Sequence, residues 1–384
     1  MHVLVIGRGV PDKQYPMNGV FEFDQARALA NNGLQVTFFA IDLRSFRRKR
    51  KFGVNSGIQD KVKWYSVDIP IGAVSPIIFR KITTWALEKL YRKVFSESDP
   101  DIIHAHFYGP AFSAAKLAEK VHIPLVVTEH CSTMNNSRVS CDILKTASFA
   151  YSKASAVIAV GKSLAESIRE KIGFEPVVVP NIMGEASFFQ SERKRHSEYF
   201  GFVFAGNLIE RKRPMQLVEG FRKLHAEYHN VRLGLIGSGP LYAQIEEEVK
   251  RSGLEECVRF YGRLPRDQIA EAYGDYDCFV LPSANETFGV AYIEALAAGL
   301  PIIATACGGP EDFFTPELGI MVPVDDKDAL VKAMKTMLES AGHYDSEKLR
   351  AYVQERFSEQ AVAKQLKDIY TDCLVRRNQA VAEQ

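Results

Sequence analysis

Short apolar runs alternate with longer amphipathic segments along almost the whole chain, and this alternation most constrains its fold. Short runs that are apolar throughout are typical of buried parallel strands, and the segments between them are long enough for crossover helices. In the first half we expect strands at residues 3–6, 36–39, 102–105, 125–128, 156–160 and 177–179. In the second half we expect strands at residues 202–205, 231–236, 258–261, 278–281, 302–304 and 320–322. The pattern predicts an α/β protein with parallel sheets.

The 384 residues suffice for two domains of ordinary size, and a break in the rhythm marks the boundary. Residues 180–184 end the first series of strands, and a polar stretch at 191–198 follows. We therefore expect two doubly wound, Rossmann-like domains, 1–182 and 183–384, that face each other across a cleft. Ligands are expected at the carboxyl ends of the strands. The last helix, about 359–378, is expected to pack back on the first domain.

Composition narrows the class of protein and its compartment. The chain is 46% hydrophobic and 25% charged, with a net charge of +1, which indicates a globular protein without the basic footprint of nucleic-acid binding. The 6 cysteines are scattered and favour a reducing cytoplasm over a disulfide framework or zinc site. We find no signal-like leader and no apolar run near the roughly 20 residues that a spanning helix needs. We expect a protein that is soluble or rests on a membrane surface.

One string in the second half joins two glutamates to an expected helix start between two buried strands, Glu286-Thr-Phe-Gly-Val-Ala-Tyr-Ile-Glu294. Phe288, Gly289 and Val290 should open the helix, whose free N–H groups and positive dipole end form an anion site. Glu286 in the loop and Glu294 in the second turn can accept hydrogen bonds from hydroxyl groups. A phosphate beside polyhydroxyl groups describes a nucleotide sugar. The alternative is that one glutamate caps the helix and the other is solvated.

With its continuation through Ala295-Leu-Ala-Ala-Gly-Leu-Pro301, this string resembles the signature of the retaining GT-B-fold glycosyltransferases of the family-4 type. The resemblance covers nearly the whole chain and implies sugar transfer with retention of anomeric configuration. It also implies that Glu286 faces the donor sugar and that Glu294 holds the ribose hydroxyls.

A basic loop, Gly206-Asn-Leu-Ile-Glu-Arg-Lys-Arg-Pro214, follows the first expected strand of the second domain. Its cations can neutralise a diphosphate, although a solvated basic loop is the alternative. The loop is similar to the family's Gly-Arg-Leu…Lys-Gly motif, which implies that Lys212 binds the diphosphate, and its loop position predicts an exposed side chain. Asn207 stands where Arg is usual and Arg213 where Gly is usual. We therefore expect Arg211 or Arg213 to assist Lys212.

Three more turns resemble donor-site segments of the family. Gly239 belongs to a Gly-x-Gly-Pro turn, and Arg263 and Leu264 follow the next strand, where the family packs the nucleobase. Glycine turns are common after strands, so the first signal is weak. Gly19 lies in a segment similar to the family's glycine-rich first loop, with Asn18 in place of one glycine. The resemblance implies that backbone N–H groups near Gly19 approach the donor phosphates; a turn before a helix is the alternative.

Three histidines in the first domain are candidates for chemistry. His104 and His106 share one face of a strand end, and His130 follows a later strand. A hydrogen-bonded core pair, a metal site that includes His130, and an active-site histidine are the three interpretations. The family resemblance favours His106 beside the sugar and acceptor, with His130 on the acceptor side.

The Asp275-Tyr-Asp277 string has the spacing of a metal-binding Asp-x-Asp motif. It directly precedes a buried strand, where the family has a structural aspartate, so we reject the metal interpretation. Lys212 and the helix start would neutralise the donor phosphate instead. We expect catalysis without a divalent metal or any other cofactor.

Two segments of the first domain suggest where an acceptor lies. Residues 44–51 are strongly basic, and residues 76–95 form an amphipathic stretch that includes Phe79 and Trp85. Basic clusters with apolar anchors suit an anionic membrane surface. The alternative is a solvated loop beside an ordinary helix that buries Phe79 and Trp85 in the core.

Together with these patterns, the family resemblance implies a glycosyltransferase that moves a sugar from a nucleotide diphosphate sugar, for example a UDP-sugar, to a hydroxyl of a saccharide or lipid-linked saccharide. We expect it in the cytoplasm, on the inner face of a membrane, in cell-surface polysaccharide or glycolipid biosynthesis. Glu286, Lys212 and His106 are the catalytic candidates. Three alternatives remain: a non-catalytic nucleotide-sugar-binding protein, an epimerase of similar fold, and a metal-dependent hydrolase built on the three histidines.

Overall fold

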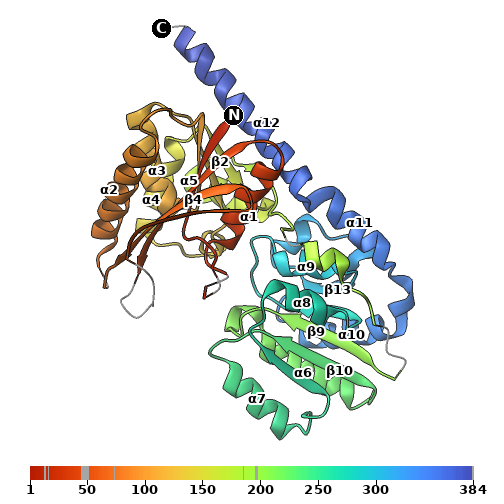
Figure 1. Ribbon diagram of the computed structural model, residues 1–384. Coiled ribbons are helices and arrows are strands. Elements are labelled where there is room, and N and C mark those ends of the chain that lie inside the picture. Colours follow the sequence, from red (N-terminus) through yellow and green to blue (C-terminus); the bar gives the residue numbers. More distant parts are fainter. Residues whose placement is uncertain are drawn as a thin grey trace. The chain divides into compact units, whose positions relative to one another are not determined.

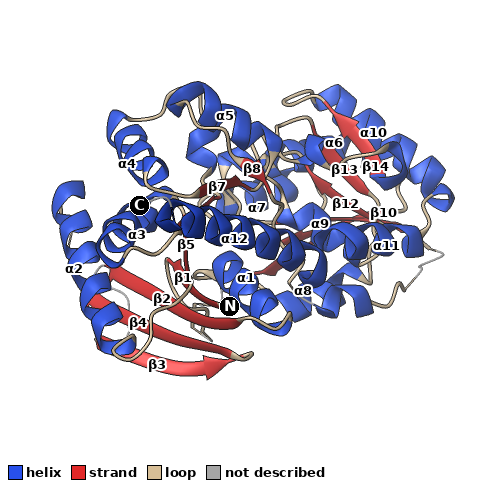
Figure 2. Cartoon of the chain, turned by 90° about the horizontal axis from the view of Figure 1, so that it is seen from above, coloured by secondary structure: helices blue, strands red, loops and turns tan. Residues whose placement is uncertain are grey.

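The computed structural model describes residues 1–12, 14–15, 17–44, 52–72, 74–184, 186–194 and 198–382. The chain divides into two compact units (Figure 1). Unit 1 comprises Met1–Gly184 together with Glu359–Gln384, and unit 2 comprises Glu185–Ser358. Each unit contains one sheet of mostly parallel strands with helical connections, which confirms the predicted α/β architecture (Figure 2). None of the helices in the described ranges is both long and apolar enough to cross a membrane.

The sheet of unit 1 has eight strands in the order β3-β4-β2-β1-β5-β6-β7-β8. Their bounds are β1 His2–Gly7, β2 Gln35–Arg44, β3 Gly53–Gln59, β4 Val62–Pro70, β5 Ile102–His106, β6 Leu125–Glu129, β7 Ala156–Ala159 and β8 Val177–Val178. All pairings are parallel except β3 with β4. Strands β2 to β4 lie on one side of β1, and strands β5 to β8 lie on the other side. The strand order therefore reverses between β1 and β5. Ligands bind preferentially at such a point.

The helices of unit 1 have local reasons for their positions. They are α1 Val20–Asn31, α2 Pro76–Val94, α3 Tyr108–Val121, α4 Cys141–Ser152, α5 Lys162–Ile172 and α12 Glu359–Ala382, with a short 3-10 turn, η1, at Ser132–Asn135. The Ser75 hydroxyl accepts a hydrogen bond from Ile78 N at the start of α2, and Ser140 does the same for Ile143 N in α4. Both are the side-chain caps that the first free N–H groups of a helix require.

A β-hairpin absent from our expected strands widens the sheet of unit 1. Strand β3 pairs antiparallel with β4, and the connecting residues Asp60 and Lys61 have φ of 50° and 65°. Two consecutive left-handed residues are typical of a tight hairpin turn that favours Asn-Gly or Asp-Gly. The sequence has Asp-Lys here, so the usual signal is missing.

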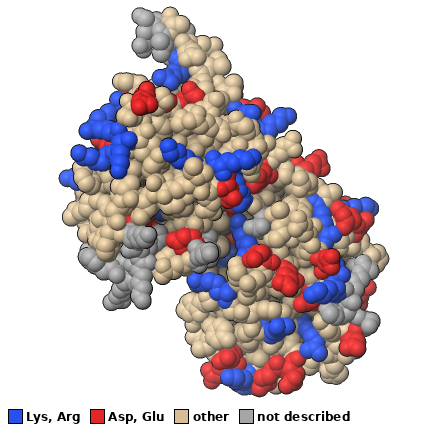
Figure 3. All heavy atoms as spheres, viewed as in Figure 1, with Lys and Arg blue, Asp and Glu red and all other residues tan. Residues whose placement is uncertain are grey.

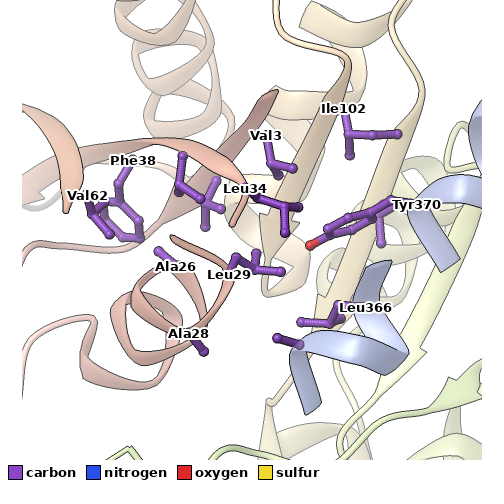
Figure 4. Packing of buried hydrophobic residues seen from close by; sticks show 14 of the residues in the cluster. Val3, Ala26, Ala28, Leu29, Leu34, Phe38, Val62, Ile102, Leu366 and Tyr370 are labelled. Atoms are coloured by element: carbon purple, nitrogen blue, oxygen red, sulfur yellow. The ribbon is translucent and has the colours of Figure 1, made fainter. Parts of the chain in front are cut away.

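Helix α12 belongs to the core of unit 1, although it comes last in the chain. Val362, Ala363, Leu366 and Tyr370 pack in one buried cluster with residues of β1, α1 and β2. Figure 4 shows Leu366 and Tyr370 directed toward Leu29, Leu34 and Ile102. The apolar face of α12 therefore lies against α1 and the sheet of unit 1.

Unit 2 has a six-stranded parallel sheet in the order β11-β10-β9-β12-β13-β14. The strands are β9 Phe200–Ala205, β10 Val231–Ile236, β11 Val258–Gly262, β12 Cys278–Leu281, β13 Ile302–Thr305 and β14 Gly319–Val322. The helices are α6 Pro214–His225, α7 Tyr242–Arg251, α8 Arg266–Tyr273, α9 Val290–Ala297, α10 Lys327–Ser340 and α11 Ser346–Phe357. Five short 3-10 turns are η2 Ala186–Gln190, η3 Glu210–Lys212, η4 Pro310–Asp312, η5 Pro316–Leu318 and η6 Ala341–His343. The strand order reverses between β9 and β12, which marks the expected ligand position in this unit.

Candidate active site

The loops that follow β9 and β12 meet at the reversal point of unit 2. Ala284 N donates to Arg211 O at 2.8 Å, and Arg211 Nη1 donates to Asn285 O at 3.0 Å. Lys212 Nζ donates to Glu286 Oε1, which also accepts from Ser283 Oγ at 2.7 Å. Residues from two distant segments, Lys212 and Glu286, thus form one ion pair at the carboxyl edge of the sheet.

The Lys212–Glu286 pair is largely withdrawn from solvent. The Lys212 side chain is 14% exposed and that of Glu286 is 8% exposed. Our expectation of an exposed Lys212 was wrong, because the lysine folds back onto a buried carboxylate. Arg211 Nη1 lies 3.9 Å from Glu286 Oε2, so a second cation flanks the same glutamate.

Helix α9 begins where the sequence predicted. Gly289 precedes its first residue, Val290, in the left-handed conformation (φ 92°). The first N–H groups of a helix have no acceptor within the helix, and its dipole favours an anion there. The Phe288 side chain is buried against Phe313 and Phe357, with ring centroids 5.6 and 5.5 Å away. The ring of Phe288 is therefore part of the core, and only the backbone of this residue can face a ligand.

Glu294 lies within α9, as the sequence predicted, and is held by a residue that our sequence reasoning missed. Arg266 Nε lies 3.3 Å from Glu294 Oε1, and both side chains are largely buried. Arg266 is the first residue of α8. Its position directly after the Gly-Arg-Leu-Pro segment was the available signal, because a cation near that turn can reach the carboxylate of the neighbouring helix.

Arg213 adopts a conformation that explains why glycine is usual at this position in the family. Its φ is 51° and it precedes α6 in the left-handed region, which costs a side-chain-bearing residue about 1–2 kcal/mol. Its guanidinium forms a fork with Asp325, with Nε–Oδ1 at 2.6 Å and Nη2–Oδ2 at 3.0 Å. The hydrogen bonds from Arg213 lower the pKa of Asp325. Asp325, rather than an open anion site, occupies this fork.

Backbone packing accounts for the glycine turn after β10. A Cβ on Gly239 would lie 2.3 Å from the carbonyl oxygen of Leu208. Leu208 N also donates to Ser238 O at 3.0 Å, so the loops after β9 and β10 are tied together. Gly239 is thus required by loop contact, and Asn207 is an exposed residue of the neighbouring loop.

The nucleobase candidates lie after β11. Arg263 is exposed and donates from Nη2 to Ser238 Oγ at 3.1 Å, while Leu264 is half-buried. Both therefore adjoin the loop that contains Gly239.

In unit 1 the three histidines have different surroundings. His104 is fully buried, with Nδ1 2.6 Å from Tyr370 Oη and Nε2 2.7 Å from Thr128 Oγ1. Burial lowers the pKa of His104 to about 3. Since both ring nitrogens have hydrogen-bond partners, the interpretation as a hydrogen-bonded core residue applies to His104.

His106 and His130 are also buried, and they contact each other. His106 Nδ1 lies 2.9 Å from His130 Nε2, and their rings stack at 5.2 Å. Burial lowers the pKa of His130 to about 4 and holds the pKa of His106 well below its usual range. None of the described residues forms a hydrogen bond with His106 Nε2. Two neutral rings, at the ends of β5 and β6, thus leave His106 Nε2 for another partner.

The metal interpretations receive no support from the geometry. Within the described ranges, no three His, Cys, Asp or Glu side chains are grouped to hold a metal ion. Asp277 Oδ2 accepts from Gly201 N at 2.8 Å and Oδ1 lies 3.4 Å from Arg193, while Asp275 pairs with Lys194 at 3.2 Å. These carboxylates connect β9 and β12 to the segment before β9.

The turn before α1 contains Gly19 and approaches the loop after β1. Gly19 has φ 71°, and a Cβ there would lie 2.0 Å from Gly9 O. A Cβ on Gly9 would overlap the Asn18 side chain. Because Gly9 has no side chain, there is room for Asn18, which stands in place of one glycine of the family loop.

Three residues of unit 1 that our sequence reasoning missed lie beside this turn and the histidines. Arg8 follows β1, Phe107 follows β5 and Glu22 lies in the first turn of α1. The Arg8 guanidinium lies over the Phe107 ring and pairs with Glu22. In the sequence, the only indication of this group was an arginine directly after the first strand.

Comparisons with known proteins show the family to which the two units are similar. The family model described as Glycosyltransferase Family 4 matches residues 20–183, and that described as Glycosyl transferases group 1 matches residues 186–359. N-acetyl-alpha-D-glucosaminyl L-malate synthase of Bacillus anthracis is 27% identical over 304 residues, which are 75% of this chain and 79% of the relative. The putative teichuronic acid biosynthesis glycosyltransferase TuaC of Bacillus subtilis is 28% identical over 360 residues, 87% of this chain and 88% of the relative.

Solved structures share the fold at low sequence identity. Sucrose-phosphate synthase from Thermosynechococcus elongatus has a TM-score of 0.77 at 20% identity and covers 98% of this chain and 99% of that one. The Anabaena protein HepE, in complex with UDP and glucose, has a TM-score of 0.73 at 17% identity and covers 97% of this chain and 100% of that one. With both units matched by glycosyltransferase family models, the chain belongs to the GT-B-fold glycosyltransferases of the family-4 type.

Proposed function

We propose that this glycosyltransferase moves a sugar from a nucleotide diphosphate sugar to a hydroxyl acceptor, with retention of anomeric configuration. The observation that carries the proposal is the meeting of Lys212, buried Glu286 and the start of α9 between β9 and β12. A cation and free helix N–H groups suit a diphosphate, and a carboxylate suits sugar hydroxyls. The HepE structure, a complex with UDP and glucose, supports this choice of ligand class.

The chemistry of the leaving group follows from these residues. Negative charge develops on the diphosphate as the sugar bond breaks, and Lys212 together with the α9 N-terminus stabilises it. Glu286 holds Lys212 in place and accepts hydrogen bonds from the sugar, while Glu294 accepts from the ribose. Arg211 is the second cation beside Glu286. Positive charge from the protein suffices in this proposal, and no divalent ion is required.

The ion pairs of the two carboxylates support the proposal of retention without a covalent intermediate. Glu286 pairs with Lys212 and Glu294 with Arg266, an arrangement that suits hydrogen bonding to hydroxyls better than covalent attack on the sugar. We therefore propose reaction on one face of the sugar: the bond to the diphosphate breaks, the acceptor oxygen bonds to the anomeric carbon, and the leaving phosphate takes the acceptor proton. His106, whose Nε2 has no hydrogen-bond partner among the described residues, is proposed to contact the sugar or acceptor.

A screen of nucleotide sugars by thermal shift, followed by product analysis, tests the proposal. A ligand present at 100 times its Kd stabilises the folded protein by about 2.7 kcal/mol. We expect one nucleotide sugar to raise Tm and then to yield a glycoside whose anomeric configuration by NMR matches that of the donor. Binding without turnover would indicate a sensor, and an epimer formed without acceptor would indicate an epimerase. Stabilisation by none of them would refute the proposal.

We further propose that the acceptor is a saccharide or lipid-linked saccharide for a cell-surface polysaccharide or glycolipid, and that the enzyme acts at the inner face of a membrane. The TuaC relative, a putative glycosyltransferase of teichuronic acid biosynthesis, supports the first part. The surface of α2 supports the second, because Trp85 is 59% and Phe79 41% exposed. The alternative that buries these two side chains in the core is therefore wrong.

The exposed face of α2 combines apolar and basic side chains. Ile77, Ile78 and Trp85 are exposed along with the cations Lys81, Lys89, Arg92 and Lys93. Figure 3 shows Lys and Arg side chains gathered over α2 at the left edge of the view. Apolar anchors among cations suit an anionic lipid surface. Residues 45–51 of the basic segment lie outside the described residues.

A further inference from the structure

Arg8 occupies the reversal point of the unit 1 sheet. It follows β1, and Phe107 follows β5, the two strands between which the order reverses. The guanidinium carbon lies 3.5 Å from the centroid of the Phe107 ring. Stacking on an aromatic ring orients a guanidinium while leaving its N–H edge open. Arg8 therefore lies where open α/β sheets bind ligands.

A buried carboxylate fixes the other side of this arginine. Arg8 Nε donates to Glu22 Oε1 at 2.8 Å; the Glu22 side chain is 0% exposed, whereas that of Arg8 is 44% exposed. No residue in the described part of the chain accepts a hydrogen bond from the terminal nitrogens of Arg8. Four N–H donors of a pre-oriented fork thus remain for a ligand.

The backbone of Phe107 indicates that the ring under Arg8 has a function. Phe107 has φ 64° and ψ 147°, a region that side-chain-bearing residues rarely occupy, at a cost of about 1–3 kcal/mol. Hydrogen bonds from Phe107 N to Thr128 O at 2.8 Å and from Ala111 N to Phe107 O at 3.0 Å maintain it. Such strain concentrates at ligand sites.

The neighbouring rings extend the site toward the histidines. Phe107 lies 4.9 Å from the His130 ring, and His130 lies 5.2 Å from His106, whose Nε2 is buried without a hydrogen-bond partner among the described residues. Burial keeps both histidines neutral at pH 7, because it lowers their pKa values. Positive charge beside these rings therefore comes from Arg8 rather than from the histidines, with the neutral His106 Nε2 close by for a hydroxyl.

We propose that Arg8 binds an anionic group, a carboxylate or a phosphate, of the acceptor, so that this enzyme glycosylates negatively charged acceptors. The proposal rests on the proposed function, which places the donor diphosphate in unit 2 beside Lys212 and the start of α9. A guanidinium fork binds either anion through two parallel hydrogen bonds. Glu22 and Phe107 hold that fork in a single orientation.

Calorimetric titration of the full chain, with and without saturating UDP, tests the proposal. The anionic probes are glucose 6-phosphate, glucuronate and L-malate, and glucose is their neutral counterpart. We expect at least one anionic probe to bind 10-fold or more tightly than glucose. The Arg8→Gln/Glu22→Gln double variant removes the fork without leaving Glu22 as a buried charge, and we expect it to lose that preference. Arg8→Lys retains the charge but not the guanidinium fork, so its preference for the anionic probe should lie between those of the wild type and the double variant.

Arg169→Gln is the matched control, because Arg169 is an exposed arginine on α5 of the same unit. It should bind every probe as the wild type does, and Tm should report that the variants are folded. Equal affinity for glucose and all anionic probes, or unchanged binding in the double variant, would overturn the proposal. A double variant that loses UDP rather than the probe would move Arg8 to the donor and overturn it too. If the proposed function were wrong but the Arg8 site real, the protein would bind no nucleotide sugar and would still bind the anionic probe through Arg8.

Discussion

Each of the two glutamates at the carboxyl edge of the unit 2 sheet is paired with its own cation. Lys212 contacts Glu286, and Arg266 contacts Glu294. The sequence singled out both glutamates and Lys212, because the glutamates lie in one motif and Lys212 in another whose spacing resembles that of the family. It did not predict the pairing, since Lys212 and Glu286 are brought together by β9 and β12, which are neighbours only in the folded sheet.

Separate substitutions of the two glutamates should have different effects on nucleotide binding. We expect Glu294→Ala to weaken UDP binding by about 1.5–3 kcal/mol, because a charge-assisted hydrogen bond to the ribose is lost. Glu286→Ala should leave UDP affinity nearly intact and reduce turnover, since Glu286 is assigned to the sugar. Calorimetry with UDP and a turnover assay measure the two effects. Equal losses of UDP affinity would contradict the assignment.

Removal of Lys212 should affect stability as well as turnover. Lys212→Ala leaves Glu286 buried without its cation, and breaking a buried pair costs about 3–5 kcal/mol. The Lys212→Met/Glu286→Gln double variant removes both charges, so we expect it to regain most of the stability but not the activity. Denaturant unfolding and turnover separate the two effects.

Turnover measured in the presence of EDTA tests whether a divalent ion is required. We expect turnover to survive EDTA, because Lys212 and the α9 N-terminus supply the positive charge. Activity abolished by EDTA and restored by manganese would contradict this prediction. A double variant that remained fully active would contradict the role of Lys212.

Buried neutral histidines should make the protein less stable in acid. His104 and His130 have folded-state pKa values of about 3 and about 4, below the ordinary value of 6.5. Between these values and 6.5 the unfolded chain binds more protons, so the free energy of unfolding falls with falling pH. The slope is about 1.4 kcal/mol per pH unit for each histidine. Their stabilising contribution is fully present above pH 6.5 and is lost as the pH falls toward about 4 for His130 and about 3 for His104.

The His104→Gln variant isolates one of these histidines. Between pH 6.5 and 4.5 its stability should fall less steeply than that of the wild type, by about one histidine's share of the slope. The comparison uses unfolding curves at several pH values, so a constant loss from the altered contacts with Tyr370 and Thr128 cancels. Parallel pH profiles for the two proteins would show that His104 does not titrate as proposed.

Among the elements, those with long apolar or amphipathic patterns were predictable and those defined by a turn were not. Residues 76–95 were expected to be amphipathic, and α2 spans Pro76–Val94. The β3–β4 hairpin was missed because its two-residue turn lacks glycine and β3 has no buried residue that would produce an apolar pattern. The sequence left two orientations of α2 open, because large apolar residues lie on both sides of this helix; the exposed Trp85 agrees with the surface interpretation and not with the buried alternative.

The exposed face of α2 should bind anionic membranes. We expect co-sedimentation with vesicles containing phosphatidylserine at low salt, and weaker binding as salt screens charges beyond a Debye length of about 8–10 Å. Replacing Lys81, Lys89 and Lys93 by Gln should remove about 1 kcal/mol of attraction per cation. Trp85→Ser should weaken binding in a way that salt alters little, because it removes an apolar anchor.

Exposed lysines elsewhere in unit 1 provide the control for α2. Lys364 and Lys367 lie on α12, and their replacement by Gln removes charge without changing the α2 face. We expect this variant to bind vesicles nearly as the wild type does. No binding to anionic vesicles at low salt, or equal losses in the α2 and α12 variants, would contradict the membrane proposal.

At the scale of the whole molecule, the C-terminal segment belongs to the unit that the N-terminal half forms, and not to the unit that precedes it in the chain. Helix α11 belongs to unit 2, whereas α12, which follows directly, belongs to unit 1. The repeating strand–helix pattern indicated two domains, but it gave no physical reason for the expected return of the last helix to unit 1. Periodicity identifies the apolar face of a helix but not the sheet against which that face packs.

Two equivalent substitutions on adjacent helices should therefore destabilise different units. Leu349 on α11 and Leu366 on α12 are both buried, and Leu→Ala in a core costs about 2–5 kcal/mol. Leu366→Ala should accelerate amide hydrogen exchange in β1 and β5, because Leu366 packs in the core of unit 1. Leu349→Ala should accelerate exchange in β9 and β12 instead. UDP should slow exchange in unit 2 of both variants, since the donor diphosphate is assigned to unit 2. If Leu366→Ala accelerated exchange equally in both units, they would unfold as one cooperative body, and the division of the chain would not describe its stability.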